Sequence, residues 1–416
     1  QGSDGLVMSV EHPTWSQPQF SSPPVRWDLK EYLPIAYSLG HILHLTAAEP
    51  ARYGLKGQPV NIFAVSNPLF TMGGNALMVR ALAQSYNVVC NVVLDETTQF
   101  ADLVIPEPTY LERYSLRGFR HDVLTGTVFN TPVVSPPDNM PDFVEVLLEV
   151  AERLGFLKGA NGVNFWFNQM GGLRSPFALD LERRYPWADI LDAWAKSTCG
   201  PEYGREWFAQ HGFKLRPRTC AEKYQPYGKA RLPIYHEFIL RTGNELQARM
   251  VEMDVEAKLG VQWDFSDYAA LPQWKPSPIH RASPEYDLYA ITYKTALSTH
   301  GRGAFNPWLV EAIERAPYVL PVWMNSATAR NRDLRDGDTV WVESPVGRVR
   351  ARLKVTELVH PEVVALATIL GHWCPHPIAR GKGAHFNTLV DISWETTDFV
   401  SGAVAVANAR VKVYRA

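Results

Sequence analysis

Three short apolar runs, separated by a helical pattern and a turn, constrain the fold of this chain most strongly. Residues 60–65 and 88–94 are almost continuously apolar, and residues 103–106 form a third short run. Between the first two runs, residues 74–86 place apolar side chains at helical spacing. Apolar strands joined by a helix predict a parallel sheet, because strands covered on both faces need no polar side. The sequence therefore predicts an α/β fold.

A polar loop follows each of the first two predicted strands. Ser66-Asn67-Pro68 comes after the first strand, and residues 95–98 come after the second. Parallel α/β sheets bind ligands at the carboxyl ends of their strands. Both loops are therefore candidate parts of a binding site.

The C-terminal segment changes character and predicts β structure. Residues 339–344 and 347–355 alternate inward and outward around a Pro345-Val346-Gly347 turn, which is typical of a β-hairpin. Further strands are predicted at 287–292, 363–367 and 405–413. The segment is therefore predicted to form a closed β-barrel.

Four regions are expected along the chain. They are an N-terminal arm and helix (1–50), a Rossmann-like half domain (51–155), a connecting and wrapping region (156–285) and the barrel (286–416). An amphipathic helix over 142–154 ends the half domain at a glycine. The connecting region mixes helical pieces with loops rich in glycine, proline and tryptophan, which favours a segment that wraps the core.

Charge and cysteine content disfavour several function classes. The 41 Lys and Arg residues nearly balance the 43 Asp and Glu residues, for a net charge of -2. A dedicated nucleic-acid binder needs excess positive charge to neutralise phosphates. No segment holds about 18 consecutive apolar residues, so no transmembrane helix is expected. No Cys-x-x-Cys pair is present, which weighs against an iron–sulfur or zinc site built from this chain; the cysteines are Cys90, Cys199, Cys220 and Cys374.

Two groups of short motifs carry a resemblance to a known protein family. The first group comprises Ser66-Asn67-Pro68, Asp95–Pro106 and Tyr110–Tyr114. The second comprises Asn325, Leu334–Val340, Gly347-Arg348-Val349, Gly371-His372-Trp373 and Asn387-Thr388-Leu389. In order and spacing, the motifs resemble the catalytic subunits of molybdopterin oxidoreductases of the dimethyl sulfoxide reductase superfamily. Leu111–Tyr114 and Ser298–Leu309 look most like polysulfide, thiosulfate and tetrathionate reductases and sulfite dehydrogenases.

The resemblance implies a fold, a cofactor and an activity. The fold is a Rossmann-like parallel sheet portion followed by a C-terminal double-psi β-barrel. The cofactor is a molybdenum bis-molybdopterin guanine dinucleotide. The activity is that of an oxidoreductase acting on a sulfur compound or similar oxyanion in respiratory electron transfer. The alternative is a metal-free scaffold subunit of a respiratory membrane complex.

The resemblance covers only the C-terminal half of such a subunit. The 4Fe-4S motif and the segment with the molybdenum ligand are expected outside this chain, and Gln1-Gly2-Ser3-Asp4 reads like a cut or processed end. The chain is therefore expected to be split, cleaved or partial. The implied partners are the N-terminal half of the catalytic subunit, an iron–sulfur electron-transfer subunit and a membrane anchor subunit, with no nucleic acid. The chain is expected to be membrane-associated through these partners.

The resemblance implies eight cofactor-binding residues and no metal ligand within this chain. They are Asn67, Asp95, Thr97, Thr295, Ser298, His300, His372 and Asn387. Asn387 is the strongest of these, because the family commonly uses an amide at this position to hold a pterin. His372 follows a glycine that permits close approach of the backbone, and it is a candidate pterin contact.

Four of these residues also have a purely structural interpretation. Asn67 can begin a turn, Asp95 can cap the turn that follows it, and Thr97 can cap rather than contact phosphate. His300 can be an ordinary loop residue instead of a pterin donor or part of a substrate funnel.

The spacing of His372, Cys374 and His376 also allows a metal interpretation. All three side chains fall on one face if this segment is extended. Because no fourth ligand lies nearby in the sequence, no metal site is predicted here.

Overall fold

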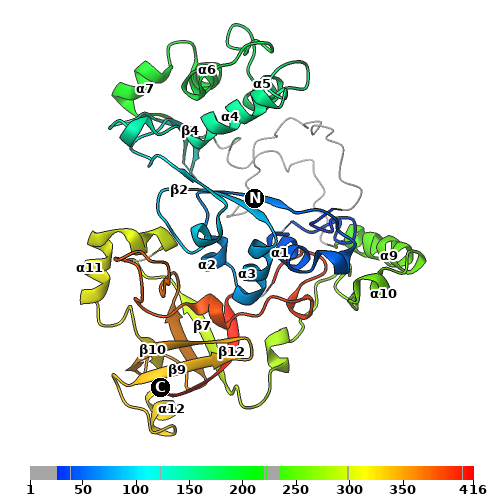
Figure 1. The fold of residues 1–416 in the computed structure, drawn as a ribbon, viewed down its shortest axis with the longest axis vertical. Coiled ribbons are helices and arrows are strands. Elements are labelled where there is room, and N and C mark those ends of the chain that lie inside the picture. Colours follow the sequence, from blue (N-terminus) through cyan, green and yellow to red (C-terminus); the bar gives the residue numbers. More distant parts are fainter. Residues whose placement is uncertain are drawn as a thin grey trace. The chain divides into compact units, whose positions relative to one another are not determined.

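The computed structural model describes residues 26–416 except 38, 122, 220–221, 223–234, 298 and 405. It contains two compact units (Figure 1). One is built from the described part of Ile105–Pro233, and the other from the described parts of Ser22–Val104 and Ile234–Ala416. The boundary at 104/105 falls inside the expected half domain 51–155, within the last strand of the parallel sheet. The expected four-part division otherwise stays a prediction.

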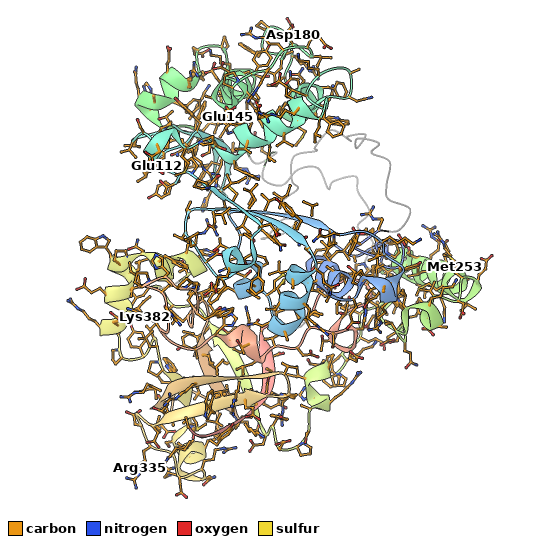
Figure 2. All side chains as sticks on the ribbon, viewed as in Figure 1. Glu112, Glu145, Asp180, Met253, Arg335 and Lys382 are labelled. Carbon is orange, nitrogen blue, oxygen red and sulfur yellow. The ribbon has the colours of Figure 1, made fainter. Side chains whose placement is uncertain are left out.

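The first unit combines a small antiparallel sheet with helices. Its strands are β4 (Ser115–Arg120), β5 (Leu124–Asn130) and β6 (Phe213–Pro217), in the order β4-β5-β6. Its helices are η3 (Pro137–Asn139), α4 (Phe143–Arg153), α5 (Val163–Gly171), α6 (Trp187–Cys199) and α7 (Arg205–His211). Phe129, Leu191 and Phe208 are buried together, so the helices of the expected connecting region have a core of their own. Glu145 on α4, labelled in Figure 2, pairs with Arg184 at 3.5 Å.

A parallel sheet begins the second unit, as the sequence predicts. Its strands are β1 (Val60–Ala64), β2 (Tyr86–Asn91) and β3 (Leu103–Pro106), in the order β1-β2-β3. β1 and β2 pair in parallel, with Val60 opposite Tyr86. Between them run α2 (Pro68–Thr71) and α3 (Asn75–Ala83), and α1 (Gly40–Ala48) packs against α3 through alanines. Met78 and Leu82 of α3 are buried next to Phe63 of β1.

The C-terminal region forms the predicted closed barrel of six strands. These are β7 (Leu288–Tyr293), β8 (Val322–Met324), β9 (Thr339–Ser344), β10 (Gly347–Val355), β11 (Val363–Ala367) and β12 (Asn408–Arg415). Around the barrel the order is β10-β8-β11-β7-β12-β9. β7 pairs in parallel with β11, and β8 with β10, while the remaining pairs are antiparallel. Two interlocked parallel pairs joined by crossovers are the topology of a double-psi barrel, and β9–β10 is the predicted hairpin.

Short helices and a second buried cluster complete this unit. The helices are η1 (Pro50–Tyr53), α9 (Glu237–Glu252), α10 (Val255–Leu259), η5 (Pro278–Arg281), α11 (Pro307–Arg315), α12 (Ser326–Arg330) and η8 (Trp394–Thr396). Ile42 of α1 and Leu246 of α9 belong to one buried cluster with Trp394, which lies in the long connection between β11 and β12. Helices α1 and α9 therefore pack on this part of the barrel's last connection. Within the described part of the chain, no helix has both the length and the apolar content needed to cross a membrane.

Candidate functional site

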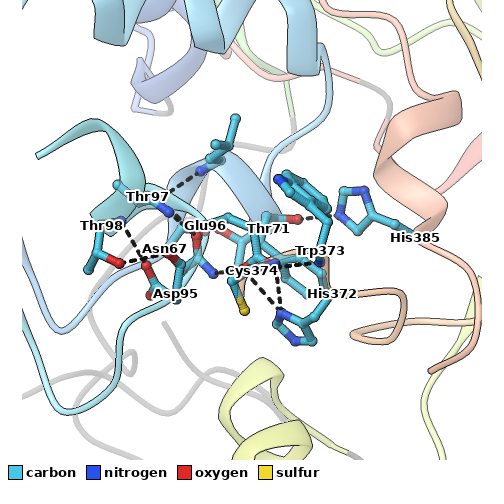
Figure 3. A network of polar contacts seen from close by, with 12 residues as sticks. Asn67, Thr71, Asp95, Glu96, Thr97, Thr98, His372, Trp373, Cys374 and His385 are labelled. Atoms are coloured by element: carbon cyan, nitrogen blue, oxygen red, sulfur yellow. Dashed lines mark hydrogen bonds and ion pairs between the residues drawn. The ribbon is translucent and has the colours of Figure 1, made fainter. Parts of the chain in front are cut away.

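Three loops of the second unit meet at the carboxyl edge of the parallel sheet (Figure 3). The first follows β1 and enters α2 at Asn67. The second follows β2 and enters η2 (Thr97–Phe100). The third follows β11 of the barrel and carries His372. The two loops predicted as site candidates therefore lie together, and the barrel contributes the third.

The backbone is strained in two of these loops. Val65, directly after β1, has a φ of 51°, and Ile369, after β11, has a φ of 62°. A β-branched residue in this left-handed region is a steric outlier that costs about 1–3 kcal/mol. Gly371 has a φ of 86°, and a Cβ there would lie 2.2 Å from the backbone nitrogen of His385. Strain of this kind concentrates at binding and active sites, because surrounding contacts must hold it in place.

Glu96 joins the three loops, and sequence reasoning missed it. Its Oε2 accepts a hydrogen bond from Asn67 Nδ2 at 2.8 Å. Its Oε1 accepts from the backbone amides of Trp373 at 2.9 Å and Cys374 at 3.0 Å. Nδ1 of His372 lies 3.1 Å from both carboxylate oxygens. The fully buried carboxylate thus ties the sheet to the barrel.

Electrostatics keep Glu96 ionised in this buried position. Burial by itself raises the pKa of a carboxyl group, because it disfavours the charged form. Hydrogen bonds from His372 and Asn67 and from the backbone of Cys374 outweigh burial and hold the pKa of Glu96 well below its usual range. The hydrogen bonds to this ionised carboxylate are charge-assisted, and are therefore stronger than those between neutral groups.

The side chains of Asn67 and Thr97 are joined by a hydrogen bond. Asn67 Oδ1 accepts from the Thr97 hydroxyl at 2.7 Å, and that hydroxyl accepts from the backbone amide of Leu69 at 3.2 Å. Since the Asn67 amide nitrogen donates to Glu96, both ends of its side chain are used within the protein. One amide N–H and the backbone of Asn67 therefore remain for a ligand.

Asp95 caps the turn that follows it. Its Oδ1 accepts from the backbone amide of Thr98 at 3.1 Å, and the Thr98 hydroxyl donates to the Asp95 carbonyl at 2.7 Å. Its Oδ2 accepts from Asn91 Nδ2. Burial raises the pKa of Asp95 to about 6, because these hydrogen bonds only partly offset the cost of desolvation.

Two side chains from the connection between β11 and β12 bind the backbone of Phe70. Asn387 Nδ2 donates to the Phe70 carbonyl at 3.0 Å, and His385 Nε2 lies 2.7 Å from the same oxygen. Burial lowers the pKa of His385 to about 4, so the ring is neutral and its Nε2–H donates. Nδ1 then accepts from the Thr388 hydroxyl at 2.8 Å. Asn387 and Thr388 lie in η7 (Phe386–Leu389).

A small cavity adjoins these loops, and a larger one lies elsewhere in the same unit. The small cavity, of about 70 Å³, is lined by Phe70, Thr71, Thr368, Ile369, His385, Phe386 and Asn387. The large one, of about 1420 Å³, lies among residues 45–53, 74–80, 260–281 and 388–404. Thr388 is on its wall and directly follows Asn387, which lines the small cavity. The large cavity exceeds the usual 300–1,000 Å³ or so of small-molecule pockets, which favours a long ligand.

The structure brings five predicted residues together at these loops: Asn67, Asp95, Thr97, His372 and Asn387. Thr295 and His300 lie on the stretch after β7, where His300 is exposed and precedes η6 (Gly301–Phe305). That stretch reaches the site through Phe305, whose ring meets His372 edge-on at 4.9 Å. Ser298 lies outside the described residues.

Ligand atoms of Glu96, His372 and Cys374 lie within 4.8 Å of one another. The donor set does not suit a metal ion, because the Glu96 oxygens already accept from an amide, an imidazole and two backbone N–H groups. Burial raises the pKa of the Cys374 thiol to about 12, whereas a metal requires the thiolate. The cluster is therefore a hydrogen-bonded junction between the sheet and the barrel.

The sequence of this chain, including the loop that carries His372, is similar to known proteins. Residues 288–404 match the family described as Molydopterin dinucleotide binding domain. Over 385 residues, the chain is 25% identical to a sulfite dehydrogenase component from Allochromatium vinosum, covering 79% of this chain and 38% of the relative. It is 23% identical to the molybdopterin-containing component of thiosulfate reductase from Salmonella typhimurium, covering 87% and 44%.

Two further similarities bear on the fold and on the cofactor. Over 134 residues, the chain is 30% identical to the molybdopterin-binding-like subunit of menaquinone reductase from Nitratidesulfovibrio vulgaris, covering 32% of this chain and 18% of the relative. The fold is similar to that of acetylene hydratase from Pelobacter acetylenicus, with a TM-score of 0.60 and 17% identity, covering 90% of this chain and 46% of that one. The chain thus spans less than half the length of these proteins.

Proposed function

Because the chain belongs to the dimethyl sulfoxide reductase superfamily of molybdopterin oxidoreductases, we propose that it is the cofactor-binding C-terminal portion of such an enzyme. One observation carries the proposal. The barrel segment that matches the dinucleotide-binding domain supplies His372 to the carboxyl edge of the parallel sheet, where Glu96 holds it. This edge is where parallel α/β sheets bind ligands.

The residues at this edge fit a polar cofactor. Gly371 allows two backbone segments to approach closely, and the strained Ile369 lines the small cavity beside Asn387. In the proposed enzyme, Asn387, Thr295 and His300 face the pterins, and the backbone at Asn67 faces the nucleotide, while Asp95 holds the turn beside it. When bound, the cofactor supplies oxygen-atom or sulfur redox chemistry. This chain's own residues fix its position and exclude water from it.

The finer features of the enzyme follow as parts of the proposal. The cofactor is a bis-molybdopterin guanine dinucleotide, and a 4Fe-4S cluster and the molybdenum ligand lie in an N-terminal half. The chain's coverage of less than half of its relatives supports this division. Electrons are exchanged with an iron–sulfur subunit and a membrane anchor subunit, which hold the complex at a membrane.

The proposed substrate is a sulfur compound or a similar oxyanion. Its support is the similarity to sulfite dehydrogenase and thiosulfate reductase along most of this chain.

Metal analysis of the native complex that contains this chain tests the proposal. We expect about one molybdenum or tungsten per copy by mass spectrometry, together with a pterin released on denaturation. Dye-coupled assays with sulfite, thiosulfate and tetrathionate then identify the substrate class. An intact complex with electron-transfer activity but no molybdenum or tungsten contradicts the proposal.

A second candidate function is a metal-free scaffold within a respiratory complex. The observation in its favour is the 30% identity to a molybdopterin-binding-like subunit of menaquinone reductase, although it extends over only 32% of this chain. The metal analysis separates the two candidates, because the scaffold binds neither molybdenum nor pterin.

A further inference from the structure

His372 is held in one orientation by contacts on three sides. Its Nδ1 faces the Glu96 carboxylate at 3.1 Å. The Phe70 ring lies parallel to the imidazole with the centroids 3.7 Å apart, and Phe305 meets it edge-on. The residue is only 2% exposed. The ring therefore has no freedom to exchange its two nitrogens.

The second ring nitrogen, Nε2, is buried and has no hydrogen-bond partner among the described residues. A buried polar atom without a partner costs about 1–3 kcal/mol. The neighbouring His385 is also buried but uses both of its nitrogens, one on Phe70 and one on Thr388. His41, buried to the same 2%, places its Nε2 at 3.4 Å from the Thr397 hydroxyl. His372 thus differs from these two buried histidines.

Glu96 determines what His372 can offer to a ligand. An ionised carboxylate only accepts hydrogen bonds, so Nδ1 carries a hydrogen and Nε2 is left for another group. A carboxylate behind a histidine fixes its tautomer and orientation in this way in many ligand sites. The pterin ring system offers several N–H and carbonyl groups that suit Nε2.

We propose that Glu96 is a positioning residue that holds His372 with its Nε2 reserved for a hydrogen bond to a pterin of the bound cofactor. The inference rests on the proposed function and deepens it, because it names one ring nitrogen and the carboxylate behind it. It also explains why a buried nitrogen at a strained junction has no partner within the part of the chain that the structure describes.

His372→Asn tests the inference, because the asparagine amide takes the place of Nδ1 and keeps a donor for Glu96 while Nε2 is removed. We expect the purified complex to lose pterin and molybdenum about tenfold faster on dilution than the wild type. His372→Gln, which extends an amide toward the Nε2 position, should restore part of the retention. Glu96→Gln should weaken both retention and thermal stability.

Asn164→Ala is the control, since it truncates a fully buried polar side chain in the other unit, where its amide donates to the carbonyls of Asp180 and Arg183. It should lower the melting temperature and leave cofactor retention unchanged. For His372→Asn we expect cofactor retention to fall, while the melting temperature of the cofactor-free protein falls no further than in Asn164→Ala.

The outcomes separate the inference from the proposed function. Wild-type retention in His372→Asn overturns the inference alone and assigns Nε2 to a buried water. Wild-type complex without molybdenum, tungsten or pterin overturns both.

Discussion

The Phe70 ring stacks on the His372 imidazole at 3.7 Å with an interplanar angle of 6°. Phe70 belongs to α2, beside the parallel sheet, whereas His372 follows strand β11 of the barrel. The Phe70 carbonyl also accepts hydrogen bonds from His385 and Asn387. One residue therefore connects two parts of the barrel to the sheet by its ring and by its backbone.

Phe70→Leu should lower the free energy of unfolding by about 1–3 kcal/mol, because it removes a buried aromatic contact and leaves a void. Urea denaturation followed by circular dichroism measures the change. Phe156→Leu is the matched control, since Phe156 is 60% exposed and should change little. Equal effects of the two substitutions would argue against a stacked junction.

Gly371→Ala should destabilise the chain by more than about 3 kcal/mol, since a methyl group there meets the His385 backbone nitrogen at 2.2 Å. Gly381→Ala serves as the control. Gly381 also has a positive φ, of 72°, but a Cβ there meets nothing within 4 Å. Gly381→Ala should lower the free energy of unfolding only by the strain of a left-handed alanine, about 1–2 kcal/mol. Thermal melting of the two variants side by side measures the clash, and a similar loss in both would contradict it.

Glu96 should make the protein sensitive to acid. Its pKa is lowered in the folded state, so the folded protein binds fewer protons than the unfolded chain near pH 4. The resulting stability is present above the ordinary glutamate value of 4.5 and is lost as the pH falls below it. Glu96→Gln should cost about 1–3 kcal/mol at neutral pH and flatten this dependence. Melting temperatures from pH 7 to pH 3 for both proteins check the prediction, and parallel curves would refute it.

Asp95 should act in the opposite direction. Its pKa is raised from 3.8 to about 6, so the folded protein binds more protons than the unfolded chain between these values. Stability from this group therefore falls as the pH rises from about 4 to 6, and the cost is complete above pH 6. Asp95→Asn keeps an acceptor for the Thr98 amide and removes the titration. As the pH rises from 4 to 7, the melting temperature of the variant should rise relative to that of the wild type. A difference that stays constant over this range would contradict the prediction.

Much of the site's location was predictable, but its central contacts were not. Asn67, Asp95 and Thr97 follow predicted strands, and their convergence follows from parallel pairing alone. Their side chains, however, bind groups of the same two loops and of strand β2 rather than facing outward. Glu96 gave no sequence signal beyond being an acidic residue in a candidate loop. Phe70 gave none, since an apolar residue in a short helix is usual.

The sequence by itself determined the elements: apolar runs that pair in a parallel sheet, and an alternating hairpin within a closed barrel. These patterns are local, because the periodicity of a strand or helix depends on residues a few positions apart. Only the tertiary structure decided that Glu96 lies against His372, which is 276 residues further along the chain. Burial creates that pair, because a carboxylate acquires its low pKa, and a histidine its fixed orientation, only when folding removes water and supplies donors from distant loops.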